Sequence, residues 1–206
     1  MQFIIDIIMN NQTVNNRIWL FVVGDNKVGK IDAIFHFLKT NPQNINSYSM
    51  MTYNKIISLL DRKVLISILA PNYNNDSIQF LMRLSNSTIM YFYDVTNSES
   101  FTTPKQIYSK YHKNDNNDSM RIEILVGNTN NLECQREISY DEAYTFAKSH
   151  NMNYFEINVV TGENVFECFY SSITQATGNN NESKKSIITP NVKVQSKKSS
   201  FYCVVN

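Results

Sequence analysis

The fold of this chain is decided by the stretch Arg17-Ile18-Trp19-Leu20-Phe21-Val22-Val23-Gly24-Asp25-Asn26-Lys27-Val28-Gly29-Lys30-Ile31. Residues 17–23 are a dense apolar run, which is typical of a strand buried inside a parallel sheet. The run leads into the pattern G-x-x-x-x-G-K, and apolar side chains then recur on one face of a predicted helix at residues 30–39. A strand, a glycine loop and an amphipathic helix in this order predict a phosphate-binding loop.

The glycine loop, residues 24–31, has a physical basis for holding phosphate. Its glycines let the backbone amides turn inward, and these amides, the helix N-terminus and Lys30 would together cradle a β-phosphate. The Ser or Thr that ends the full motif is missing, because Ile31 stands in its place. The string alone also fits an ordinary strand-to-helix turn with a solvated Lys30, so its interpretation depends on the rest of the chain.

Strand-like and helix-like patterns alternate along the chain. We expect strands at 17–23, 53–60, 63–69, 88–93, 121–127 and 153–157, and helices at 30–39, 75–84, 98–112, 139–150 and 163–173. The two residues 61–62 separate the second and third strands, which predicts one antiparallel hairpin. Ser98 and Ser139 are the expected N-caps of their helices. Met82, Phe92, Phe155 and Phe166 are expected in the core.

This order of elements predicts an α/β fold with an open, six-stranded, mostly parallel sheet that is covered by helices on both faces. In such sheets, ligands bind beyond the carboxyl ends of the strands, so the loops at that edge are the candidate site.

Composition narrows the class of protein. At 206 residues the chain is long enough for one buried domain and a tail. Its formal net charge of +1 means that the whole molecule exerts no strong electrostatic field on nucleic acid or membrane. Three widely spaced cysteines form no disulfide or metal-ligand pattern, which favours a reducing cytosol. The apolar run in the first nine residues is too short to span a membrane and lacks the basic start of a signal peptide.

Three further segments resemble the Rab/Ras-type small GTPases, and they occur in the family's order and spacing. They are Tyr93-Asp94-Val95-Thr96-Asn97-Ser98-Glu99-Ser100-Phe101, Leu125-Val126-Gly127-Asn128-Thr129-Asn130-Asn131-Leu132 and Glu156-Ile157-Asn158-Val159-Val160-Thr161-Gly162-Glu163-Asn164-Val165. The second resembles the family's L-V-G-N-K-x-D-L, which reads guanine, and the third its E-T-S-A-K-T-G-E-N-V. The resemblance covers residues 17–175 and the C-terminus.

The resemblance implies a P-loop NTPase, Rossmann-like G domain at residues 17–177 that binds GTP and GDP and regulates membrane traffic or signalling through effector and regulator proteins. It also implies the nucleotide-binding residues, which are Gly24, Asp25, Asn26, Lys27, Val28, Gly29, Lys30, Ile31, Asn128, Asn131 and Asn158.

The family's magnesium and water ligands are replaced. Ile31 stands for the Ser or Thr whose oxygen binds Mg²⁺, and Ala70 stands for the carboxylate that holds the metal's water shell. Tyr73 and Asn74 replace the glycine and the glutamine that face the γ-phosphate and the attacking water. The switch threonine falls on Tyr48, with Ser47 and Ser49 adjacent, so a slip of one residue would restore a hydroxyl. We expect no side-chain Mg²⁺ site and no catalytic residues.

The base site is altered as well. Asn131 replaces the aspartate that accepts two hydrogen bonds from guanine, and its amide offers one acceptor and one donor. The donor would face guanine's amine, whereas a carbonyl, as in xanthine, would suit it. Thr129 replaces a lysine and Asn158 a serine. GTP and GDP binding is therefore expected to be weak or absent.

The ends of the chain lie outside this domain. Residues 1–16 are a predicted extension, and residues 178–206 form a polar tail with five lysines against one glutamate. The ending Cys203-Val204-Val205-Asn206 is close to a C-a-a-X box, although Asn206 is an unusual last residue. Prenylation of Cys203 together with the lysines would hold the protein on the cytosolic face of a membrane. A free thiol on the tail is the alternative.

The sequence thus predicts a Rab/Ras-like protein that works by protein–protein contact with a crippled nucleotide cycle. A working GTP or xanthine-nucleotide switch is the alternative, with metal and water ligands from Ser47, Ser49, Asn74 or a partner. An enzyme of another P-loop class, such as a kinase, ranks last because no acceptor-site base or lid is recognisable.

Overall fold

The computed structural model describes residues 17–39, 51–59, 62–71, 87–112, 122–130 and 136–178. Within these ranges, ten elements follow one another. They are β1 (Arg17–Gly24), α2 (Lys30–Leu38), β2 (Met51–Leu59), β3 (Arg62–Ala70), β4 (Ser87–Asp94), α4 (Ser98–His112), β5 (Ile122–Asn128), α5 (Tyr140–Ser149), β6 (Asn153–Ile157) and α6 (Val165–Ala176). The predicted helix at 75–84 lies outside the described residues.

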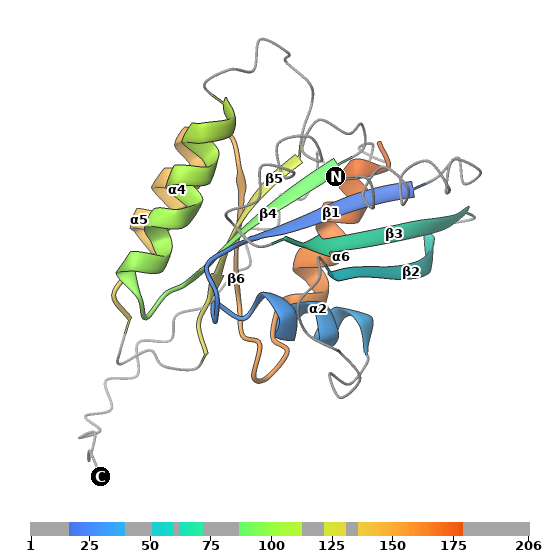
Figure 1. Cartoon of the computed structure of the whole chain (residues 1–206), viewed down its shortest axis with the longest axis horizontal. Helices are drawn as coiled ribbons and strands as arrows, with labels where there is room; N and C mark the ends of the chain where they lie inside the picture. The colour runs from blue at the N-terminus through green and yellow to red at the C-terminus, as the bar shows by residue number, and fades with distance from the viewer. Residues whose placement is uncertain are drawn as a thin grey trace.

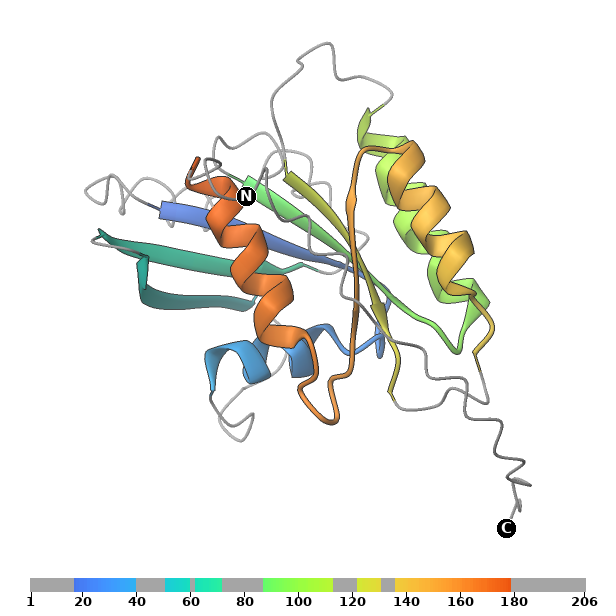
Figure 2. The same cartoon turned by 180° about the vertical axis from the view of Figure 1, so that it is seen from behind.

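One six-stranded sheet has the order β2-β3-β1-β4-β5-β6. β2 and β3 pair antiparallel, as predicted, and every other neighbouring pair is parallel. Arg62, which was predicted in the connection, is instead the first residue of β3 and pairs with Leu59. Helices α4 and α5 cover one face of the sheet and α2 and α6 cover the other (Figures 1 and 2). The predicted fold class is confirmed. Among the described residues, no helix is long and apolar enough to cross a membrane.

Side-chain caps begin two of the four described helices, and one of them corrects a prediction. The Ser139 side chain accepts a hydrogen bond from the Glu142 amide at 3.1 Å and caps α5, as predicted. Ser98 was the wrong choice for α4, because it is the first helical residue. The side-chain oxygen of Asn97 accepts bonds from the amides of Glu99 and Ser100 at 3.0 and 3.4 Å, so Asn97 is the cap.

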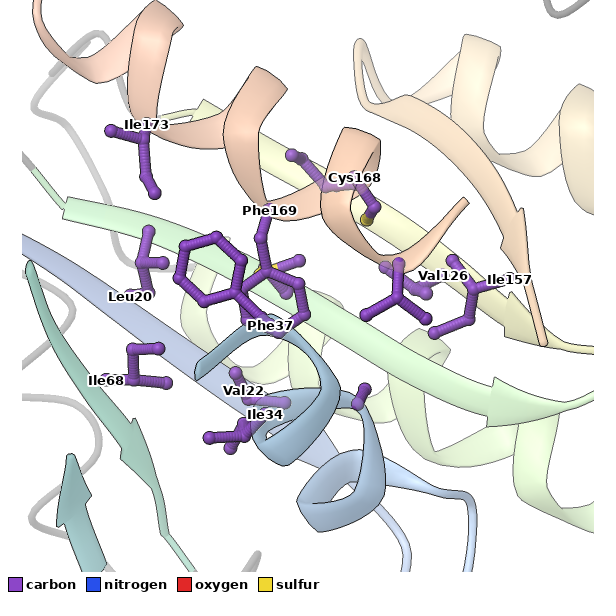
Figure 3. Close-up of a cluster of buried hydrophobic side chains, with 14 of the residues drawn as sticks. Leu20, Val22, Ile34, Phe37, Ile68, Val126, Ile157, Cys168, Phe169 and Ile173 are labelled. Atoms are coloured by element: carbon purple, nitrogen blue, oxygen red, sulfur yellow. The ribbon is translucent and has the colours of Figure 1, made fainter. Parts of the chain in front are cut away.

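The core on the α2/α6 face is built around two aromatic rings. Phe37 of α2 and Phe169 of α6 stack with centroids 4.8 Å apart, above Leu20 of β1 and Ile68 of β3 (Figure 3). All four side chains are buried, so this contact joins the two helices to each other and to the middle of the sheet.

Phe166 is not in this core, contrary to the prediction. It is 49% exposed and stacks on Tyr170, and its ring lies tilted at the margin of the core, with its centroid 6.0 Å from that of Phe37. Phe92 is fully buried as predicted, Phe155 is half-buried against the same core, and Met82 lies outside the described residues.

The face under α4 and α5 holds a second core with a polar edge. Tyr93 of β4 packs on Phe101 of α4, and its hydroxyl lies 2.9 Å from that of Tyr154. Tyr154 donates to Glu156 at 2.7 Å, and Arg136 clamps the same carboxylate through two bonds of 2.8 and 2.9 Å. This network ties β6 to β4 and to the segment that precedes α5.

Truncating the stacked ring tests the α2/α6 core. Phe169→Ala removes a fully buried side chain, so the free energy of unfolding should fall by about 3–5 kcal/mol. Tyr170→Ala, in the same helix but 41% exposed and outside this core, is the control and should cost about 1 kcal/mol or less. Urea denaturation of both variants measures the difference. Equal losses would contradict the assignment of the core face of α6.

Candidate functional site

The topology gathers the candidate segments at one edge of the sheet. Strands β3, β1, β4, β5 and β6 run parallel, so their carboxyl ends lie side by side. Gly24 pairs with Phe92, Asp94 with Asn128, and Asn128 with Ile157 in neighbouring strands. The glycine loop, the segment from Asn128 and the loop after β6 therefore meet, as expected for a parallel sheet.

Both glycines of the loop are required by close contacts. Gly24 has φ 141°, and a Cβ there would overlap the Phe92 carbonyl oxygen of β4. Gly29 has φ 87°, and a Cβ there would overlap the Asn128 side-chain nitrogen. Any other residue would push the loop away from Phe92 of β4 or from Asn128, so each glycine sets the position of one end of the loop.

Lys30 holds the first residues of the loop through hydrogen bonds to their carbonyl oxygens. Its ammonium donates to the carbonyl oxygen of Gly24 and, at 2.7 Å, to that of Asp25. The side chain is only 9% exposed, and this burial lowers the pKa of the Lys30 ammonium to about 8, against the opposing pull of the Asp25 carboxylate. Lys30 is thus part of the loop's own structure and is not a solvated helix start.

The loop is also tied to α4. The hydroxyl of Thr103, which is nearly buried, donates to the Asp25 carboxylate at 2.7 Å. Asp25 thereby receives contacts through both its main chain and its side chain. Lys27, between the two glycines, has φ 67°, a left-handed conformation that is uncommon for a residue with a side chain.

Asn128 joins the loops through its side-chain amide. It is fully buried, its nitrogen donates to the Val28 carbonyl at 3.2 Å, and its oxygen accepts from the Val159 amide at 3.4 Å. Its polar atoms therefore bond the glycine loop on one side and the β6–α6 loop on the other.

Asn158 shapes its own loop. Its side-chain oxygen accepts from the amides of Val160 and Thr161 at 2.9 and 3.0 Å, which turns the chain after β6. Thr129 donates to the Ile157 carbonyl through its amide and its hydroxyl, at 2.8 and 3.2 Å. Asn131, the predicted base reader, lies outside the described residues, as do Tyr48, Tyr73, Asn74 and Cys203.

The positions expected to hold magnesium carry hydrocarbon. Ile31 and Ala70 are both half-buried and pack against the α2/α6 core. Within the described ranges, no three or more His, Cys, Asp or Glu side chains gather as metal ligands. Mg²⁺ prefers an octahedron of oxygens, and these two side chains supply none, so the described residues do not fit the family's ion.

A cavity of about 1000 Å³ opens beside the glycine loop. Its walls come from the loop, from the segments after β5 and β6, and from one side of α2. These contribute Lys27 and Gly29; Asn128, Asn130, Val159 and Val160; and Asp32, Phe35, His36 and Lys39. Of the predicted site residues, the structure thus brings Lys27, Gly29 and Asn128 to one cavity, next to Lys30.

Sequence reasoning missed Asn130 and the α2 side of the cavity. Asn130 has φ 41°, and its side-chain oxygen is shielded from solvent with no hydrogen-bond partner in the described part of the chain. A shielded acceptor without a donor is costly, which marks Asn130 as a feature of the site. The available signal was its place two residues after Asn128.

The pKa of Lys30 gives the site a pH signature. Its folded value of about 8 lies below its ordinary 10.5, so between these values the unfolded chain binds a proton that the folded chain releases. The free energy of unfolding should therefore rise with pH from about 8 to 10, by roughly 1–3 kcal/mol relative to Lys30→Met. Urea denaturation of both proteins at each pH measures this, and parallel pH curves would contradict it.

Comparison with known proteins agrees with this geometry. A sequence model of the Ras family matches residues 19–178. The chain is 28% identical over 158 residues to Ras-related protein rab-39 of Caenorhabditis elegans, spanning 73% of this chain and 69% of that protein. It is 29% identical over 157 residues to Ras-related protein R-Ras of Rattus norvegicus (73% and 70%), and 27% identical over 158 residues to Ras-related protein Rab-2B of Dictyostelium discoideum (75% and 77%). With the family match across most of its length and the glycine loop in its expected place, the chain belongs to the Ras family of small GTPases.

Proposed function

We propose that this Ras family protein acts through contacts with effector and regulator proteins, and that its binding and hydrolysis of GTP are weakened or lost. The observation that carries the proposal is the packing of Ile31 and Ala70 into the α2/α6 core. These positions stand where the resemblance places a magnesium-binding hydroxyl and a carboxylate. The phosphate cradle of Gly29 and Lys30 is kept, whereas the oxygens beside it are replaced.

The loss matters because this chemistry depends on electrostatics. Phosphoryl transfer in this class relies on positioning and on metal and side-chain charges around the phosphates. Removing one such group typically lowers the rate by about 10²–10³, and effects of groups that act together do not add simply. With no oxygen at Ile31 or Ala70, a bound ion would depend on phosphates and water, so we propose that turnover is negligible.

The base site supports the same proposal. The side-chain amide of Asn128 is hydrogen-bonded to the main chain of Val28 and Val159, which gives it a structural role whether or not a base is present. At Asn131, an amine would face guanine's amine, and such an unmatched group costs about 1–3 kcal/mol. We therefore propose that any residual binding favours xanthine over guanine nucleotides.

We extend the proposal to the basic tail at residues 178–206, with the G domain at 17–177 and an extension at 1–16. A prenyl group on Cys203 and the upstream lysines would hold the protein on the cytosolic face of a membrane, where its partners would meet it. The mass of the C-terminal peptide from the native cell decides this, since an unmodified Cys203 would remove the anchor.

Restoring the metal ligands tests the central point. The double variant Ile31→Thr/Ala70→Asp returns a hydroxyl and a carboxylate, so its affinity for GDP should rise in Mg²⁺ by about tenfold or more, and fall again in EDTA. Titration with a fluorescent GDP analogue measures this.

The matched control is Ile31→Val/Ala70→Asn, which has nearly the same shape as the restored variant without its hydroxyl and carboxylate. It should bind as weakly as the unchanged protein, with no response to Mg²⁺. Tight, Mg²⁺-dependent GTP binding and turnover by the unchanged protein would refute the proposal.

Exchanging one base-site residue tests nucleotide preference. Asn131→Asp replaces the donor by a second acceptor, so the ratio of GDP to XDP affinity should rise by about tenfold or more. Competition of GDP and XDP against one fluorescent nucleotide measures the ratio for both proteins. Tighter binding of GDP than of XDP by the unchanged protein would remove the xanthine preference.

A further inference from the structure

The cavity beside the glycine loop carries an excess of positive charge. Lys27 and Lys39 line it from the loop and from the end of α2, and His36 adds a titratable imidazole. Asp32, in the first turn of α2, is the one acid among the lining residues. With His36 neutral the lining has a net charge of +1, from two lysines and one aspartate. A cavity of this charge at a helix N-terminus suits an anion.

Lys27 shares a left-handed backbone with Lys39, whose φ is 55°, but only Lys27 lies on the glycine loop. Its φ of 67° is left-handed, a region that glycine adopts freely and other residues seldom do. It lies in the loop between Gly24 and Gly29, and it is exposed. A strained lysine at a ligand-binding loop points to a use for its side chain.

Lys30 cannot supply all the positive charge that a polyphosphate needs. Its ammonium is held by the carbonyl oxygens of Gly24 and Asp25 beneath the loop, and burial disfavours its charged form. A bound divalent ion would ordinarily supply part of the positive charge, but the side chains of Ile31 and Ala70 carry no oxygen that could bind such an ion. The exposed Lys27, on the cavity side of the same loop, is the group placed to compensate.

We propose that this cavity binds a nucleoside polyphosphate without a divalent cation, and that Lys27 supplies the positive charge a metal would otherwise bring. This rests on the proposed function, because it follows from the loss of the metal's side-chain ligands. Asp32 opposes the binding as a fixed negative charge in the same wall. The phosphates would then be held by lysines and backbone amides alone.

Calorimetric titration of the full chain with GDP, XDP and inorganic tripolyphosphate, each in EDTA and in Mg²⁺, tests the proposal. Affinity should be the same with and without Mg²⁺ and should fall as salt rises. Lys27→Gly should weaken binding about tenfold, the loss of one charge-assisted contact, while relieving the left-handed strain so that the variant still folds.

Three further variants separate charge from structure. Lys27→Arg keeps the positive charge and should keep the affinity. Asp32→Asn removes the opposing negative charge and should tighten binding by roughly threefold to tenfold. Lys63→Ala is the control, because Lys63 is exposed near the amino end of β3, at the opposite edge of the sheet, and should leave binding unchanged.

The outcomes distinguish this inference from the proposed function. Metal-free binding that Lys27→Gly leaves unchanged overturns the role of Lys27 and leaves the proposed function standing. If GDP, XDP and tripolyphosphate all fail to bind, the role of Lys27 is likewise overturned and the proposed function still stands. Binding that requires Mg²⁺ overturns both, because it shows that an ion is held despite Ile31 and Ala70.

Discussion

The buried side-chain amide of Asn128 is the interaction on which the site depends. It connects Val28 of the glycine loop with Val159 after β6, across chain separations of 100 and 31 residues. If this buried amide lost either partner, a polar group would remain desolvated without a hydrogen bond. The glycine loop, the end of β5 and the loop after β6 are therefore held in place together. Gly29 lies against this amide with no room for a Cβ, which fixes the loop over it.

Near Asn128, the residues that maintain the fold are kept, whereas two positions where the family binds metal carry apolar side chains. Ile31 and Ala70 add apolar surface to the core that Phe37 and Phe169 organise, which favours the folded domain. The same substitutions remove oxygens from the edge where phosphates would lie. Under the proposed function, this chain keeps the fold of the family while losing groups that would act on nucleotide, because packing and catalysis depend on different atoms.

Much of the fold could be predicted, and the failures have physical causes. The short connection between β2 and β3 predicted their antiparallel pairing, and the Ser139 cap and the buried strands followed from local chemistry. The cap of α4 was placed one residue late because Asn97 and Ser98 are both good caps, and only the backbone geometry distinguishes them. Phe166 was expected in the core because it is aromatic, but it lies at the margin of the α2/α6 core, where its contacts with Phe37 and Tyr170 leave it 49% exposed.

The sequence by itself determined the strand–loop–helix unit around Gly24 and Lys30, the order of the elements and the absence of oxygen from Ile31 and Ala70, because each of these depends on residue type and local spacing. Tertiary structure alone decided that the Asn128 amide spans two loops, that Asn130 is left with a shielded oxygen, and that Lys27, Asp32 and Lys39 face one cavity. These relations depend on how parallel strands align their ends and how α2 lies against them, and such distances between remote segments have no signature in a single sequence.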